Sequence, residues 1–168
     1  RELNAEAASI ARSACEEAGG QRFVLGSMGP GTKLISLSQV SWDAMLGSYC
    51  EQATGLLEGG VDAFLVETCQ DLLQAKCAIC ACMDALAQAG RSVDDVPIMV
   101  SITIETTGTM LLGSNLEAVA NALRPFPIAS LGLNCATGPA EMADHVAWLS
   151  RHWDRPISVV PNAGLPTL

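Results

Sequence analysis

The sequence predicts an α/β fold in which helices and strands alternate along the chain of 168 residues. Five short, almost entirely apolar segments alternate with five longer segments that carry apolar residues at helical spacing. The starts of the apolar segments lie 39, 36, 33 and 26 residues apart, as expected for successive βα units. Such units form a parallel sheet, and strands this apolar are typical of a sheet covered on both faces.

The five helical segments have recognisable starts and ends. The predicted helices cover residues 3–18, 42–58, 72–89, 114–123 and 139–150. In the first of them, apolar residues recur at three- and four-residue spacing, at Ala7, Ile10, Ala11 and Ala14. Residues suited to helix starts stand at the later ones: Ser41, Asp71, Ser114 and Pro139. Glycines that end a helix follow the first three: Gly19, Gly59 and Gly90.

The predicted strands cover residues 22–25, 61–66, 97–102, 130–133 and 156–160. Five parallel strands suit either an open doubly wound sheet or part of a barrel of eight βα units. The open sheet usually carries G-x-G-x-x-G after its first strand, whereas the glycines at 26–31 are spaced differently. A phosphate-binding loop is therefore not expected. In a barrel, these five strands would form an internal piece.

Composition argues against several classes of function. The net charge is −9 and only 16% of residues are charged, which disfavours binding to nucleic acids or to an anionic membrane surface. No apolar run approaches the roughly 18 residues of a membrane-spanning helix. The seven cysteines, an odd number, indicate reduced thiols in a cytoplasmic protein. Because the chain begins with Arg1, we expect the natural amino terminus to lie further upstream.

Polar side chains gather where the predicted strands end. In strand order they are Ser27, Glu67, Thr103 with Glu105, Asn134 with Cys135, and Asn162. In a parallel barrel all strand ends surround one mouth, where active sites lie. Serine, threonine and asparagine also serve as turn formers and caps, so a structural role is the alternative for each of them. Glu67 differs, because a carboxylate directly after an apolar strand needs a cation or several donors, and the ammonium group of a substrate would serve.

Cys135 is the most informative residue of the chain. It follows the apolar run 131–133 and precedes Pro139, where a helix begins. A helix amino terminus favours negative charge, and therefore a thiolate that acts as nucleophile or metal ligand. The alternative is a small core residue, as free cysteines often are. We assign that structural role to three cysteines of the predicted third helix, which offers no tight turn to wrap an ion: Cys77, Cys80 and Cys82.

Five motifs occur in an order and spacing that we can compare with known families. They are 26–30 (GSMGP), 66–68 (VET), 105–113 (ETTGTMLLG), 132–139 (GLNCATGP) and 161–166 (PNAGLP). Together they resemble the homocysteine-binding domain of homocysteine S-methyltransferases, and among these the cobalamin-dependent methionine synthases. The resemblance covers essentially the whole chain. It implies a (β/α)8 barrel, of which residues 1–168 would be a partial domain that spans the third to seventh strands.

The resemblance also implies roles for individual residues. Cys135 would be the first of three cysteine ligands of a zinc ion, and the other two would form an adjacent pair in a G-G-C-C-G-T motif that these 168 residues do not contain. Glu67 would hold the amino group of homocysteine, and Asn162 would lie in the substrate pocket. The turn with Ser27 and Gly29 would line that pocket. The resemblance assigns no catalytic side chain to this part of the barrel.

The implied reaction is zinc-dependent methyl transfer to the thiol of homocysteine, which gives methionine. Zinc deprotonates a bound thiol, and three protein thiolates leave the fourth tetrahedral position for the substrate sulfur. The donor would be methylcobalamin, supplied by cobalamin- and folate-binding modules of a parent chain, so residues 1–168 alone are expected to be inactive. The alternatives are betaine or S-methylmethionine as donor, or a non-catalytic, truncated α/β module.

Overall fold

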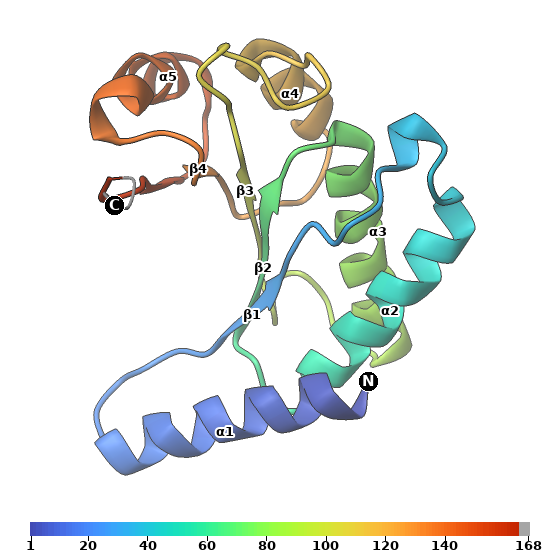
Figure 1. The fold of residues 1–168 in the computed structure, drawn as a ribbon. Helices are drawn as coiled ribbons and strands as arrows, with labels where there is room; N and C mark the ends of the chain where they lie inside the picture. The colour runs from blue at the N-terminus through green and yellow to red at the C-terminus, as the bar shows by residue number, and fades with distance from the viewer. Residues whose placement is uncertain (165–168) are drawn as a thin grey trace, which may run out of the picture.

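The computed structural model describes residues 1–164, which contain five parallel strands in one sheet (Figure 1). The strands are β1 (Leu25–Met28), β2 (Ala63–Cys69), β3 (Ile98–Ile102), β4 (Ser130–Asn134) and β5 (Ile157–Val160). Their order in space is their order in the sequence. A doubly wound sheet reverses its strand order at a switch point. The unbroken order therefore excludes that alternative and agrees with successive units of a barrel.

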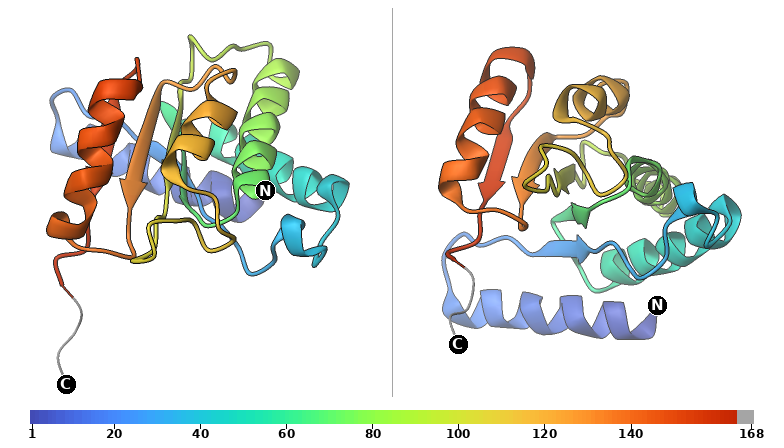
Figure 2. Two further views of the ribbon diagram at one scale, coloured as in Figure 1. Left: turned by 90° about the horizontal axis from the view of Figure 1, so that it is seen from above. Right: turned by 45° about the horizontal axis from the view of Figure 1, so that its top comes forward.

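Helices follow one another around the outside of the sheet (Figure 2). They are α1 (Glu2–Ala18), α2 (Trp42–Glu58), α3 (Leu72–Gln88), α4 (Leu116–Leu123) and α5 (Pro139–His152), with a short 3-10 helix, η1 (Ile35–Leu37), before α2. Ser41 and Asp71 each accept a backbone N–H from the first turn of their helix, which confirms both predicted caps. The cap of α4 is Asn115 rather than Ser114, because the Asn115 side chain accepts the N–H of Ala118 at 2.9 Å.

The first two strands end later than the sequence predicts. β1 was expected at 22–25, and β2 was expected to end at residue 66. Gly26 and Ser27 are typical turn residues, and the sequence therefore places them in a loop. In the structure the missing Cβ of Gly26 lets β1 approach α2, where an added Cβ would lie 3.0 Å from the Leu56 side chain. Ser27 consequently lies inside β1, paired with Leu65, and not in the turn that follows it.

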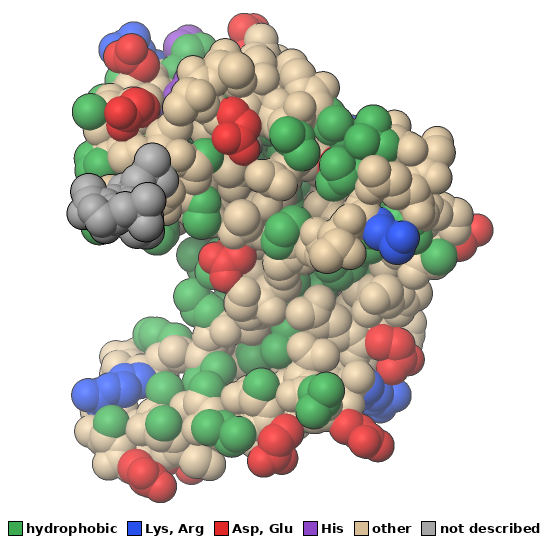
Figure 3. Space-filling model, viewed as in Figure 1, with side chains coloured by type: hydrophobic (Ala, Val, Ile, Leu, Met, Phe, Trp, Pro, Cys, Tyr) green, Lys and Arg blue, Asp and Glu red, His purple; other side chains and the backbone are tan. Residues whose placement is uncertain are grey.

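The central strands are buried, whereas the two edge strands are partly open. Every residue of β4 is buried, but Leu25 on β1 is 46% exposed and Val160 on β5 is 62% exposed. The side of the sheet opposite α2 and α3 is hollowed (Figure 3), and a cavity of about 860 Å³ there is lined in part by Phe23, Leu25 and Met99. This is the surface expected of a piece of barrel wall. No helix within residues 1–164 has the length and apolarity needed to cross a membrane.

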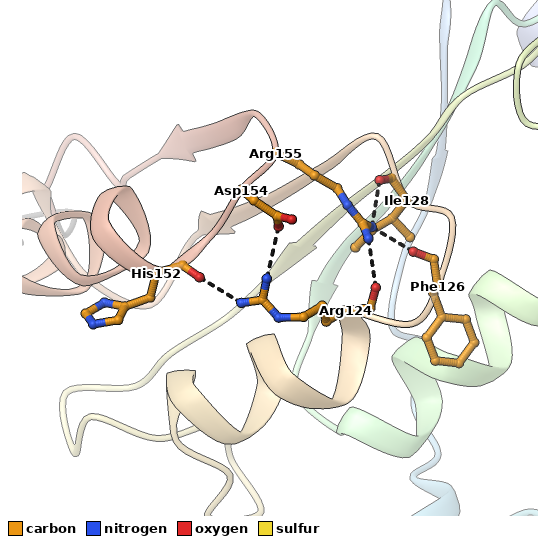
Figure 4. A network of polar contacts seen from close by, with 6 residues as sticks. All are labelled: Arg124, Phe126, Ile128, His152, Asp154 and Arg155. Carbon is orange, nitrogen blue, oxygen red and sulfur yellow. Dashed lines mark hydrogen bonds and ion pairs between the residues drawn. The ribbon is translucent and has the colours of Figure 1, made fainter.

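A guanidinium network joins the end of α4 to the segment before β5 (Figure 4). Arg155 donates to the backbone carbonyls of Arg124, Phe126 and Ile128 at 2.8, 2.7 and 3.2 Å. Arg124 caps the end of α4, and Phe126 and Ile128 lie in the segment that follows. Their carbonyls have no helical N–H as partner, and the guanidinium supplies the donors instead. Two guanidinium groups also contact the buried ring of Trp153. The guanidinium carbons of Arg124 and Arg155 each lie 5.3 Å from the ring centroid. One arginine thus fixes the connection that leads into β4.

We expect Arg155→Lys to lower the free energy of unfolding by about 1–2 kcal/mol, because the three N–H groups of a lysine leave one nitrogen and cannot reach all the carbonyls that two guanidinium nitrogens serve. Chemical denaturation measures the effect. Arg151→Lys is the matched control, since Arg151 is exposed on α5, and it should change stability by less than about 0.5 kcal/mol. Equal losses in the two variants would show that the network does not stabilise the fold.

Candidate active site

The carboxyl ends of β2 and β4 meet through two residues that are far apart in the sequence. The backbone N–H of Thr68 donates to Asn134 Oδ1 at 3.1 Å, and Asn134 Nδ2 donates to Thr68 Oγ1 at 2.7 Å. Glu67 directly precedes the first of these residues, and Cys135 directly follows the second. The structure therefore brings two predicted site residues to the same end of the sheet.

Glu67 and Ser27 lie on the same face of neighbouring strands. Ser27 pairs with Leu65, so the side chains of Leu65 and Glu67 share its face, while Phe64 and Val66 point to the buried side. The Ser27 hydroxyl donates a hydrogen bond to Glu67 Oε1. The Glu67 side chain is only partly buried, and within residues 1–164 it forms no salt bridge. The hydroxyl thus fixes one carboxylate oxygen, and the carboxylate is placed to receive a cationic group from a ligand.

Cys135 has a polar environment rather than an aliphatic one. Its backbone has a φ of 60°, in the left-handed region, and Ala136 follows with a φ of 55°. The N–H of Cys135 donates to the Val160 carbonyl at 3.2 Å, which extends the pairing of β4 with β5. Its partly buried sulfur accepts a hydrogen bond from Asn134 Nδ2 at 3.1 Å. The interpretation as a small core residue therefore does not describe Cys135.

Asn162 lies beside the turn that begins at Cys135. Its backbone N–H donates to the Thr137 carbonyl at 3.1 Å. Together with Thr106, Ala136 and Glu141 it lines a cavity of about 250 Å³ at this end of the sheet. The last residues of its motif, 165–166, lie outside the described residues. Asn162 is the one predicted site residue that lines this cavity, and its place in a substrate pocket stays a prediction.

The Gly29 turn is held from outside the sheet. Its carbonyl accepts a hydrogen bond from the Tyr49 hydroxyl at 3.1 Å. The buried Gln74 side chain donates to the carbonyls of Pro30 and Lys33 in the same loop. No direct contact joins Gly29 to Glu67 or Cys135 among the hydrogen bonds of residues 1–164. The structure therefore shows an anchored turn after β1, and its lining role stays a prediction.

Two of the three cysteines of α3, Cys77 and Cys82, are core residues as predicted, whereas Cys80 is only partly buried. Cys77 and Cys82 are fully buried, and the sulfur of Cys82 lies 3.4 Å from the sulfur of Met28. Burial raises the pKa of the Cys77 thiol to about 12, which keeps it protonated. In the part of the chain that the structure describes, no three or more His, Cys, Asp or Glu side chains are grouped to hold a metal ion. Cys135 on its own can supply one sulfur ligand.

From the sequence we did not predict the residues whose hydrogen bonds to Asn134 hold the site together. Thr68 was quoted only as part of a motif, and Ser101 was not considered, although its hydroxyl donates to Asn134 Oδ1 at 2.7 Å. Thr103, predicted as a strand-end candidate, is buried and donates to the Asn134 carbonyl at 3.1 Å. Ser101 is a polar residue within an otherwise apolar strand, and this pattern could have identified it. A buried amide such as that of Asn134 needs hydrogen-bond partners on neighbouring strands.

Comparisons with known proteins agree with this geometry. The profile of a family described as homocysteine S-methyltransferase matches residues 1–168. The methionine synthases of Mycobacterium tuberculosis (strain ATCC 25618 / H37Rv) and Mycobacterium leprae (strain TN) are each 50% identical over 171 residues. These alignments cover 100% of this chain but 14% of each relative, so the chain spans a small part of the curated relatives that it matches.

Solved structures share the fold. The apo form of the homocysteine methyltransferase MmuM from Escherichia coli has a TM-score of 0.76 and 24% identity, covering 96% of this chain and 60% of that chain. Its metallated form has a TM-score of 0.76 and 22% identity, covering 96% of this chain and 58% of that chain. At this identity the likeness supports the fold, and it fits a five-strand part of a methyltransferase barrel.

Proposed function

The chain belongs to the homocysteine S-methyltransferase family, and on that premise we propose that it is the homocysteine-binding part of a cobalamin-dependent methionine synthase. The proposed reaction transfers a methyl group to the thiol of homocysteine and gives methionine. The 50% identity to two methionine synthases over the whole chain supports this choice within the family. The methyl donor, methylcobalamin on cobalamin- and folate-binding modules of a longer parent chain, is proposed from the sequence resemblance.

The observation that carries the proposal is the polar placement of the Cys135 sulfur. A thiol at the end of a parallel strand, which accepts an N–H hydrogen bond and is tied through Asn134 to the residue after Glu67, is suited to ligand chemistry. A sulfur ligand and a carboxylate on one edge of a sheet match the two ends of an amino acid that carries a thiol. Homocysteine is such a molecule.

The residues of this chain would bind and orient the substrate. We propose that Glu67 accepts hydrogen bonds from the substrate ammonium group while the Ser27 hydroxyl holds the other side of the carboxylate. The cavity beside Asn162 would take the rest of the amino acid. The Gly29 turn would help to line the pocket. The substrate sulfur would then lie near Cys135.

Zinc is the metal that we propose for this site, with Cys135 as one of three cysteine ligands. The donor chemistry fits, because the sulfur is partly buried and already carries an N–H partner of the kind that supports metal-bound thiolates. When bound, zinc would hold the substrate thiol in its thiolate form. We expect the other two ligands to be an adjacent cysteine pair roughly 60 to 70 residues after Leu168 in the parent protein, about two further barrel units.

We also propose a reducing, cytoplasmic location, because cysteine ligands of zinc must be in the reduced form. All seven cysteines are free thiols in the structure. A thiolate ligand set of this kind requires compartments that keep cysteines reduced.

Glu67→Gln is the variant that tests substrate binding. We expect the dissociation constant of homocysteine for the zinc-loaded parent protein to rise about 10- to 100-fold, because a hydrogen bond to a charged group contributes about 1.5–3 kcal/mol. Calorimetric titration measures the affinity, and atomic absorption confirms that zinc content is unchanged. Glu51→Gln on the exposed face of α2 is the control and should bind homocysteine normally. Unchanged affinity in Glu67→Gln would reject Glu67 as the amine ligand.

A further inference from the structure

Asn134 is the residue through which the two halves of the candidate site touch. Its side chain is 4% exposed. The Oδ1 atom accepts hydrogen bonds from the Thr68 backbone N–H at 3.1 Å and the Ser101 hydroxyl at 2.7 Å. The Nδ2 group donates to Thr68 Oγ1 at 2.7 Å and to Cys135 Sγ at 3.1 Å. A carboxamide has two acceptor positions and two donors, so its whole capacity is used.

The orientation of this amide follows from its neighbours. A backbone N–H can only donate, so the Asn134 atom that faces the nitrogen of Thr68 must be the carbonyl oxygen. The Nδ2 group is consequently the one that faces the sulfur of Cys135. An N–H donor directed at the sulfur occupies one of its lone pairs and so fixes the direction in which the remaining lone pairs point.

Both partners of the amide have unfavourable backbone conformations. Thr68 has a φ of 59° and Cys135 a φ of 60°. This region suits glycine, and it is especially unfavourable for a β-branched residue such as threonine. Strain of this kind costs roughly 1–3 kcal/mol per residue and persists only where the surroundings impose it. The hydrogen bonds of Asn134 reach both strained residues, so this amide is placed to impose both conformations.

We propose that Asn134 is a positioning residue of the methyl-transfer site. Its amide fixes the orientation of the Cys135 sulfur and, through Thr68, the position of Glu67. The inference rests on the proposed function, in which Cys135 binds zinc and Glu67 binds the substrate amine. Hydrogen bonds to the ligands of a metal orient those ligands, and their loss typically lowers metal affinity about 10- to 100-fold.

Asn134→Asp in the full-length parent protein tests this inference. The aspartate keeps the one oxygen that accepts from the Thr68 N–H and the Ser101 hydroxyl, but places a second oxygen, in place of an N–H donor, against the sulfur. We expect zinc affinity, measured by competition with a chelator, to fall about 10- to 100-fold. We also expect the cobalt(II)-loaded variant to lose part of its thiolate-to-cobalt charge-transfer absorption, because one of three cysteine ligands is displaced, whereas a purely structural role would leave the absorption unchanged.

Ser101→Ala is the matched control. It removes a buried hydrogen bond to the same amide and leaves the N–H donor on the sulfur, so zinc affinity should stay within about twofold of the wild type. Equal losses of zinc affinity in both variants, or a lower melting temperature in Asn134→Asp with normal zinc affinity, would overturn the inference.

Two further outcomes remain informative. If Asn134→Asp does not fold, Asn134→Ala removes the N–H donor on the sulfur without burying a charge, and it should lower zinc affinity about 10-fold or more. An unchanged affinity in that variant would also overturn the inference. A wild-type parent protein that binds no zinc would overturn the proposed function itself, whereas zinc binding that needs Cys135 but not Asn134 would overturn the positioning role alone.

Discussion

Replacing Cys135 with alanine is expected to lower the zinc affinity of the parent protein about 100- to 1,000-fold and to abolish methyl transfer. Zinc sites built from protein side chains bind with about 10–16 kcal/mol in total, so one of four ligands contributes about 2.5–4 kcal/mol. The substitution removes the sulfur that the Asn134 amide contacts at this end of the sheet. Zinc content after dialysis, together with chelator competition, measures the effect.

Cys80→Ala provides the control for that experiment. Cys80 is a partly buried thiol on α3, away from the ends of β2 and β4, and its loss should leave zinc content and methyl transfer unchanged. A Cys135→Ala protein that keeps one zinc per chain at wild-type affinity would show that the ligand assignment is wrong. The family assignment would stand in that case, because it rests on the whole sequence.

Gly132→Ala is expected to lower the free energy of unfolding by about 3 kcal/mol, the largest stability effect that we predict. Gly132 pairs with Ser158 of β5. A Cβ at position 132 would overlap the Ser158 side chain and lie 2.6 Å from its carbonyl oxygen. β4 cannot move away, because it also pairs with β3 on its other side. Any shift of β4 would displace Asn134 and Cys135, so activity should fall together with stability.

Chemical denaturation of Gly132→Ala and Gly47→Ala compares the same substitution in opposite environments. Gly47 is exposed on α2, and an added Cβ there meets nothing within 4 Å. Alanine in a helix is favoured over glycine, so Gly47→Ala should raise the free energy of unfolding by about 0.5–1 kcal/mol. A loss below about 1 kcal/mol in Gly132→Ala would mean that β4 and β5 do not approach each other this closely.

The helices could be predicted from the sequence because their signals are local. α2 spans Trp42–Glu58, as expected from the Ser41 cap and the glycines that follow it, and α5 begins at Pro139 as expected. A cap, an apolar spacing and a terminal glycine each act within a few residues. The parallel sheet followed equally from the alternation of the two patterns, since parallel neighbours require a crossover between them.

Strand ends were harder to predict because a strand extends as far as its partners allow. Gly26 and Ser27 have turn-forming side chains, yet they lie in β1 because they pair with Phe64 and Leu65 of β2. Local propensity is weaker than such pairing, particularly where a glycine permits close packing against a helix. The sequence contains no signal for that choice within the loop itself.

The sequence alone determined the order of the elements, the family, and the strand-end residues Glu67, Cys135 and Asn162 as candidates. Only the tertiary structure decided how they are held together. The amide of Asn134 contacts Thr68, 66 residues away, and the threonine has a backbone conformation that its own side chain disfavours. Such a contact forms because neighbouring strands bring buried polar groups into reach of one another, and each then satisfies the hydrogen-bonding needs of the other.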